Sequence, residues 1–132
     1  MKPELFWLTL SAIATGLMFL PYILDRIAVR GLMGTMANPS PADAPQHAWA
    51  QRAQRAHANA VENLVVFVAL VAAAQFAGIS SAQTVLGCQL YFWARLAHYV
   101  IYSAGIPVLR TLAFAVALVG EALIALALLP TM

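Results

Sequence analysis

The run NLVVFVALVAAAQFAGISSAQTVLGCQLYFWA, residues 63–94, contains no Asp, Glu, Lys or Arg and decides the class of fold. A membrane-spanning helix needs roughly 20 predominantly apolar residues, so this run is too long for one span. The sequence GISS at 78–81 divides it. Ser80 and Gln83 have the spacing of a capping box, which predicts that a helix begins there. The run therefore predicts two antiparallel membrane helices joined by a short turn.

A further span is predicted on each side of this pair. Residues 5–24 carry no charged side chain, which predicts a first span, with a kink near Pro21. Towards the C-terminus, Gly105 is suited to end a helix and Pro107 to begin the next one. The predicted helices cover residues 4–29, 46–77, 81–104 and 107–130, and residues 1–132 form a single domain.

The composition agrees with this pattern. Of the 132 residues, 63% are hydrophobic and 9% are charged, whereas a soluble domain carries about 25% charged residues. The fold class predicted is therefore an all-α membrane protein, an up-down bundle of four transmembrane helices. The formal net charge of +2 is too small to indicate nucleic-acid binding. In so small a bundle, a ligand site is expected between helices or between subunits.

The basic residues predict the orientation of the bundle in the membrane. They flank the first and third predicted loops and are missing from the second. Basic residues favour the cytoplasmic side. We therefore expect the first and third loops to face the cytoplasm and both termini to lie on the opposite side. The residues concerned are Arg26, Arg30, Arg52 and Arg55 at the first loop and Arg110 at the third.

The predicted helix 46–77 begins with a polar stripe. At 100° per residue, Arg52, Arg55, Asn59 and Glu62 fall within about 80° of one another, while His57 points to the other side. The stripe runs from the cytoplasmic interface into the membrane. Ionisable residues at that depth indicate a functional site.

The predicted helix 81–104 carries a second polar face. Arg95 lies on it at a depth where a charge needs a partner. Glu62 is the expected partner, and Glu121 is the alternative. The members of this face are Tyr91, Arg95, His98 and Tyr102.

Arg110 lies in the first turn of the predicted helix 107–130, and Thr111 adds a hydroxyl group. Free backbone N–H groups and the helix dipole favour an anion there. A guanidinium at this place can bind a carboxylate or hold a thiol as thiolate. Structural roles compete with this interpretation, since helix-end arginines also reach for lipid phosphates and buried ion pairs can serve stability alone. The convergence of both polar faces on one cavity favours a functional site.

These residues carry a resemblance to a known family. The pattern resembles the MAPEG family, the membrane-associated proteins in eicosanoid and glutathione metabolism, and its bacterial branch in particular. The resemblance covers essentially the whole chain. It is carried by Arg52-x-x-Arg55-Ala56-His57-x-Asn59-x-x-Glu62, then Arg95-x-x-His98-x-x-x-Tyr102, and then Arg110.

The resemblance implies a homotrimer, expected in a bacterial inner membrane, that binds glutathione as co-substrate between neighbouring subunits. A lipophilic electrophile or hydroperoxide would enter from the bilayer, which makes the protein a glutathione-dependent transferase or peroxidase. Arg110 would be catalytic, by stabilising the thiolate, and no metal is implied. The residues expected to bind glutathione or substrate are Arg30, Arg52, Arg55, Asn59, Glu62, Arg95, His98, Tyr102 and Thr111.

Other functions remain open at this stage. Thr111 stands where prostaglandin E synthases of the family have serine, so prostaglandin chemistry is not inferred. A non-enzymatic lipid-binding or scaffolding protein would bind its ligand without turnover. A small proton-coupled transporter would depend on an intramembrane acid, for which Glu121 is the candidate.

Overall fold

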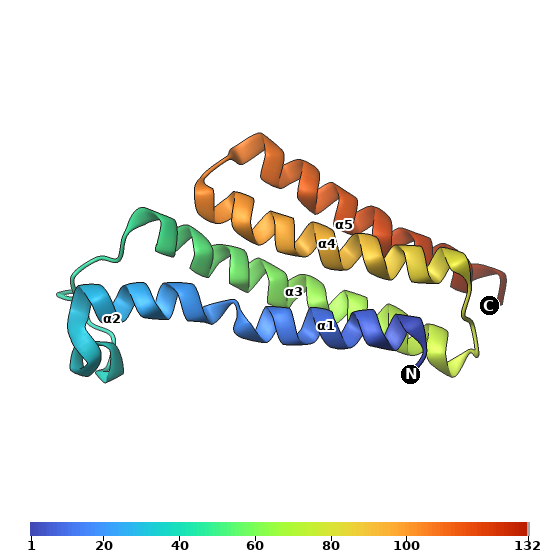
Figure 1. Cartoon of the computed structure of the whole chain (residues 1–132), viewed down its shortest axis with the longest axis horizontal. Helices are drawn as coiled ribbons and strands as arrows, with labels where there is room; N and C mark the ends of the chain where they lie inside the picture. The colour runs from blue at the N-terminus through green and yellow to red at the C-terminus, as the bar shows by residue number, and fades with distance from the viewer. Residues whose placement is uncertain (132) are drawn as a thin grey trace.

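The structure is a computed structural model that describes residues 1–131, with side chains described for residues 1–130. The helices form an up-down bundle in which α1 and α2 make one broken rod (Figure 1). Both termini lie at one end of the bundle, and the α2–α3 and α4–α5 connections lie at the other. The elements are α1 (Pro3–Leu17), α2 (Phe19–Met36), α3 (Ala48–Phe76), α4 (Ala82–Ala104), α5 (Pro107–Leu128) and the 3₁₀ helix η1 (Leu129–Thr131).

The predicted four-helix membrane fold is confirmed. Three helical segments, Pro3–Met36, Ala48–Phe76 and Pro107–Leu128, are long and apolar enough to cross a membrane. The fourth, α4, has 23 residues, or about 34 Å at 1.5 Å per residue, and matches the hydrocarbon core in length. It carries Arg95 and His98 within its length, and it packs against α1, α3 and α5.

The first rod is broken at Met18, where the chain makes a turn between α1 and α2. The cause is Pro21, which has no N–H to donate to the carbonyl of Leu17 and whose ring clashes with that carbonyl. The kink expected near Pro21 thus lies one turn before it. Tyr99 of α4 donates a hydrogen bond to the carbonyl of Met18 over 2.8 Å, which fixes the break against the bundle.

The end of the first rod differs from the predicted limit at residue 29. The chain is helical to Met36, across a bend at Gly31, whose φ of 72° is the left-handed conformation that glycine adopts readily. Beyond this bend α2 turns away from the rod (Figure 1). The helix therefore ends later than predicted, because the left-handed glycine bends the chain without ending it.

The start of α4 also differs from the prediction by one residue. The N-cap is Ser81, which forms a capping box with Thr84, in place of Ser80 with Gln83. Ser80 and Thr84 instead donate hydrogen bonds to the carboxylate of Glu4, at 2.9 and 2.6 Å. Glu4 is 1% exposed. These contacts fasten the first turn of α1 to the first turn of α4.

The closest helix contact joins α4 to α5. A Cβ atom on Gly87 would lie 2.6 Å from the carbonyl oxygen of Gly120, and one on Gly120 would lie 2.5 Å from that of Gly87. Small residues allow two membrane helices to approach in this way. Beside this contact, the rings of Phe67 and Tyr91 stack at a centroid distance of 3.8 Å. The other buried core residues are Val71, Ala74, Cys88, Ala94, Ala117 and Ile124.

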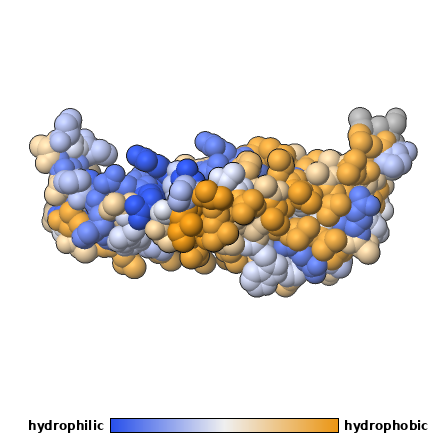
Figure 2. All heavy atoms as spheres, turned by 90° about the horizontal axis from the view of Figure 1, so that it is seen from above, coloured by the Kyte–Doolittle hydropathy of each residue, from blue (hydrophilic) through white to orange (hydrophobic). Residues whose placement is uncertain are grey.

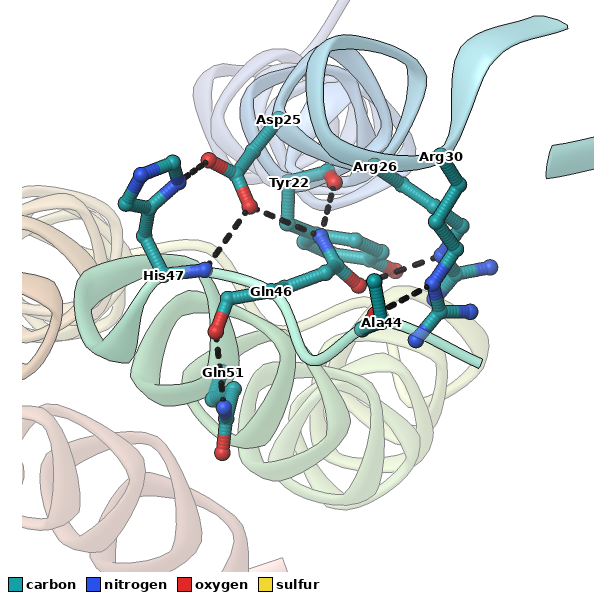
Figure 3. Close-up of polar contacts among 8 residues, drawn as sticks. All are labelled: Tyr22, Asp25, Arg26, Arg30, Ala44, Gln46, His47 and Gln51. Atoms are coloured by element: carbon teal, nitrogen blue, oxygen red, sulfur yellow. Dashed lines mark hydrogen bonds and ion pairs between the residues drawn. The ribbon is translucent and has the colours of Figure 1, made fainter. Parts of the chain in front are cut away.

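A polar network fixes the loop before α3 (Figure 3). The carboxylate of Asp25 accepts hydrogen bonds from the backbone N–H of His47 at 3.2 Å and from Gln46 at 3.2 Å, and it pairs with the His47 ring at 2.6 Å. Gln46 also donates to the carbonyl of Tyr22 over 2.6 Å. Because Asp25 is buried, this network sets where α3 begins and therefore where its polar stripe lies.

Candidate functional site

The polar residues of the bundle gather toward the end that carries the α2–α3 and α4–α5 connections. Figure 2 shows hydrophilic residues concentrated over this end and mostly apolar residues, with smaller hydrophilic patches, over the rest of the visible face. The residues predicted from sequence to form a site come from α2, α3, α4 and α5 at this end. The structure brings some of them together and separates others.

Arg95 binds Asn59, and the predicted pair with Glu62 is wrong. The Nη2 atom of Arg95 donates a hydrogen bond to Oδ1 of Asn59 over 2.8 Å. Glu62 is exposed and forms no ion pair within the described residues. The reason is the rotation of α3, which buries Ala56 and Ala60 against the bundle and turns Glu62 outward. The alternative partner, Glu121, is also buried, but among the described residues no hydrogen bond or ion pair joins it to Arg95.

The interior around Arg95 contains several polar atoms that the described residues leave without a hydrogen bond. The side chains concerned are at most 6% exposed. Buried polar groups of this kind are costly in an apolar environment, so they mark a place that packing alone does not explain. The atoms are Tyr91 Oη, Arg95 Nε and Nη1, His98 Nδ1 and Glu121 Oε1.

Arg110, Tyr102 and His98 form a second group at the turn between α4 and α5. The guanidinium carbon of Arg110 lies 4.3 Å from the centre of the Tyr102 ring, which is a cation–π contact. The rings of His98 and Tyr102 meet edge to face at 5.6 Å. Gly105 ends α4 with a φ of 84°, and Pro107 begins α5. The turn thus holds a fixed cation at the N-terminus of a helix, where an anion is favoured.

Three further predicted ligand-binding residues also have partners within the chain. Arg52 donates from Nε to the carbonyl of Ser103 over 3.0 Å, at the C-terminus of α4. Arg30 donates to the carbonyl of Ala44 over 2.8 Å (Figure 3), and it pairs with the carboxylate of Asp43 at 3.5 Å. The third is Thr111, whose hydroxyl group bonds within α5. The arginines therefore hold the ends of helices and loops together.

Thr111 is exposed and donates its hydroxyl hydrogen bond to the carbonyl of Pro107 over 3.2 Å. This bond lies within the first turns of α5. It satisfies one backbone acceptor there and leaves the free N–H groups of that turn available.

Arg55 and Glu62 lie on the exposed face of α3, next to Ala58 and Val65, away from the interior group. We expected the two polar faces to converge on one cavity. Within a single chain they do not enclose one. No pocket is enclosed by the described residues. The interior group thus comes from α4 and α5 together with Asn59 of α3, and Arg55 and Glu62 form an outer pair on α3.

Some polar contacts at this end were not predicted from the sequence. Tyr22 Oη and His57 Nδ1 form a hydrogen bond of 2.8 Å between α2 and α3, and Asp25 anchors the loop. The available signal was a set of polar residues at helical spacing, Tyr22, Asp25 and Arg26, near the end of an apolar span. His57 points away from the stripe, in agreement with its predicted direction.

Comparison with known proteins gives one match. The protein-family model described as the MAPEG family matches residues 5–130. No curated protein and no solved structure matches the chain.

Proposed function

We propose, because the chain belongs to the MAPEG family, that it is a glutathione-dependent membrane transferase or peroxidase. Its second substrate would be a lipophilic electrophile or hydroperoxide dissolved in the bilayer. Membership supports a glutathione-related function of the transferase or peroxidase type at the level of the family. The observation that carries the proposal is the placement of Arg110 over Tyr102 at the start of α5.

Arg110 would act on the thiol of glutathione. A guanidinium and a helix N-terminus both stabilise a thiolate relative to a thiol. In conjugation, the thiolate sulfur forms a bond to an electrophilic carbon while the leaving group departs with its electron pair. In peroxide reduction, the sulfur attacks one peroxide oxygen, the alcohol leaves after protonation, and a second glutathione converts the sulfenic acid to the disulfide and water. Positioning and electrostatic stabilisation would be the main catalytic contributions.

The outer pair of α3 supports a site completed by a second copy of the chain. Arg55 and Glu62 are exposed on a membrane helix and form no ion pair within the described residues. A charged side chain facing lipid costs about 2.5–3.5 kcal/mol at the middle of a span. A neighbouring subunit would cover them, and Arg55 would then suit a carboxylate of glutathione and Glu62 its amino group. We therefore propose a homotrimer with glutathione between subunits.

The same proposal includes an orientation of the bundle in the membrane. The end with the α2–α3 and α4–α5 connections carries the basic residues and would face the cytoplasm of a bacterial cell, with the termini across the inner membrane. Glutathione is a soluble tripeptide and would enter from that side.

Two measurements on protein purified in mild detergent test this function. The first is turnover of a model electrophile and of a lipid hydroperoxide with glutathione, for which Arg110→Lys is the charge-retaining control and Arg110→Ala the inactive variant. The second is native mass spectrometry, for which three chains per particle are expected. Ligand binding without turnover of either substrate would favour a scaffolding protein. An active monomer would contradict a site between subunits.

A further inference from the structure

The last turn of α2, residues 32–36, carries an apolar surface to which the proposed function gives no role. The side chains of Leu32, Met33 and Met36 are 59%, 75% and 67% exposed. They occupy positions i, i+1 and i+4, so they share one face of the turn. Apolar residues that gather on a surface in this way mark a contact with a membrane or with another protein.

A bend at Gly31 sets the direction of this turn. Gly31 has a φ of 72° and a ψ of 169°, a conformation that is essentially confined to glycine. The chain beyond it turns across the axis of the rod, to the side opposite α3, α4 and α5 (Figure 1). The other face of the turn is closed by the chain itself, because Thr35 donates a hydrogen bond to the carbonyl of Gly31 over 2.9 Å. A Cβ atom on Gly34 would lie 3.1 Å from that of Arg30. The apolar face is therefore the outer one.

The rod reaches the surface of the membrane at this bend. From Pro3 to Gly31 a helix rises about 42 Å, which equals the thickness of a bilayer with its headgroups, about 40–45 Å. Basic and aromatic residues mark the same level. Arg30 precedes the bend and donates to the carbonyl of Ala44, and Trp49 in the first turn of α3 is 40% exposed. The segment 32–36 thus begins among the headgroups.

The composition of the segment suits lipid. Residues 31–42 contain no Asp, Glu, Lys or Arg, so no charge has to leave water when the apolar face enters the membrane. A helical segment at the interface buries its apolar face about 5–10 Å into the boundary between headgroups and acyl chains. The apolar surface also continues from the span, where Leu24 of α2 is 64% exposed. The surface that we assign to a second chain lies elsewhere, at Arg55 and Glu62 of α3.

We propose that residues 32–36 form an interfacial anchor whose partner is the lipid bilayer. The segment lies in the plane of the membrane, with Leu32, Met33 and Met36 against the upper part of the acyl chains. It holds the end of α2 at a fixed depth and, through the bond from Arg30 to Ala44, the loop before α3 as well. The anchor does not depend on glutathione, so it stands or falls separately from the proposed function.

Site-directed spin labelling of the protein in lipid nanodiscs tests the anchor. Met33→Cys and Met36→Cys carry the labels, and Asn38→Cys, exposed in the loop beyond the segment, is the control. Cys88 is 0% exposed, and the wild type taken through the same reaction is the blank. The labels at 33 and 36 are expected to be more accessible to oxygen, which concentrates in acyl chains, than to a water-soluble nickel chelate. The label at 38 is expected to show the reverse.

Two results would overturn the proposal. A preference for the nickel chelate at 33 and 36 as well as at 38 would place the segment in water. Low accessibility to both reagents at 33 and 36 would mean that protein covers the face, as a second copy of the chain would do.

The role of the bend is tested with the label kept at position 33. Gly31→Ala removes the conformation that only glycine adopts readily, and a Cβ atom at Gly31 meets nothing within 4 Å, so the substitution acts through the backbone alone. Gly16→Ala is the matched control, since a Cβ atom at Gly16 also meets nothing within 4 Å. The oxygen preference of the label is expected to be lost in Gly31→Ala and kept in Gly16→Ala. An unchanged preference in both variants would contradict placement of the anchor by the bend.

Discussion

The guanidinium carbon of Arg110 lies 4.3 Å from the centre of the Tyr102 ring, across the turn that joins α4 to α5. Gly105 and Pro107 make this turn short, so the two side chains meet over a fixed backbone. The ring thus sets the direction in which the cation points. A thiolate bound at the start of α5 would meet a charge that is already oriented.

The first prediction concerns this contact. A cation–π interaction contributes about 1 kcal/mol, so Tyr102→Leu is expected to lower kcat/KM for glutathione about fivefold to tenfold. Tyr102→Phe keeps the ring and is expected to stay within about twofold of the wild type. Steady-state kinetics with a model electrophile measures both. If Phe is as damaging as Leu, the hydroxyl group matters and the ring contact does not.

The second prediction concerns the Gly87–Gly120 contact. A methyl group on Gly87 would lie 2.6 Å from a backbone oxygen of α5, so Gly87→Ala must separate α4 from α5. Overpacking of this kind costs about 1–3 kcal/mol, and a Tm lowered by several degrees is expected in a thermal unfolding assay.

Gly16 is the matched control for this substitution. A Cβ atom there meets nothing within 4 Å, and alanine is a better helix former than glycine. Gly16→Ala is expected to keep or raise the Tm. Equal Tm values for the two variants would show that the close contact of α4 and α5 does not contribute to stability.

The third prediction separates two arginines of one stripe. Arg52 binds the carbonyl of Ser103, so Arg52→Met is expected to cost about 1–3 kcal/mol of unfolding free energy, the range for a hydrogen bond to a charged group. Arg55 is exposed, so Arg55→Met is expected to leave the stability of the folded chain unchanged and to weaken glutathione binding. Thermal unfolding and a binding titration measure the two effects. The reverse result would exchange the two roles.

The sequence predicted the number of helices and their breaks because these depend on local signals. The uncharged run 63–94, Gly105 and Pro107 each act within one or two turns of the chain. The errors of a few residues, at Gly31 and at Ser81, have the same origin. Several small or polar residues at these places can end or cap a helix, and contacts from other helices, such as that of Glu4 with Ser80, select among them.

The arrangement of the site could be predicted only in part. Helical spacing placed His98 and Tyr102 on one face of α4, and the tight turn after α4 brings Arg110 over the Tyr102 ring. It did not find the partner of Arg95. Asn59 and Glu62 lie on the same stripe of α3, and which of them faces α4 depends on the rotation of the whole helix. That rotation is set by the packing of Ala53, Ala56 and Ala60.

The most direct test of the account is the ionisation of glutathione bound to the purified protein. Glutathione is titrated into wild type and Arg110→Ala at neutral pH, and the ultraviolet absorbance of the thiolate is followed. We predict a thiolate signal that saturates with the wild type and is absent from Arg110→Ala, although that variant still binds the tripeptide. Bound glutathione without thiolate absorbance, or an equal signal from both proteins, would contradict the role of Arg110.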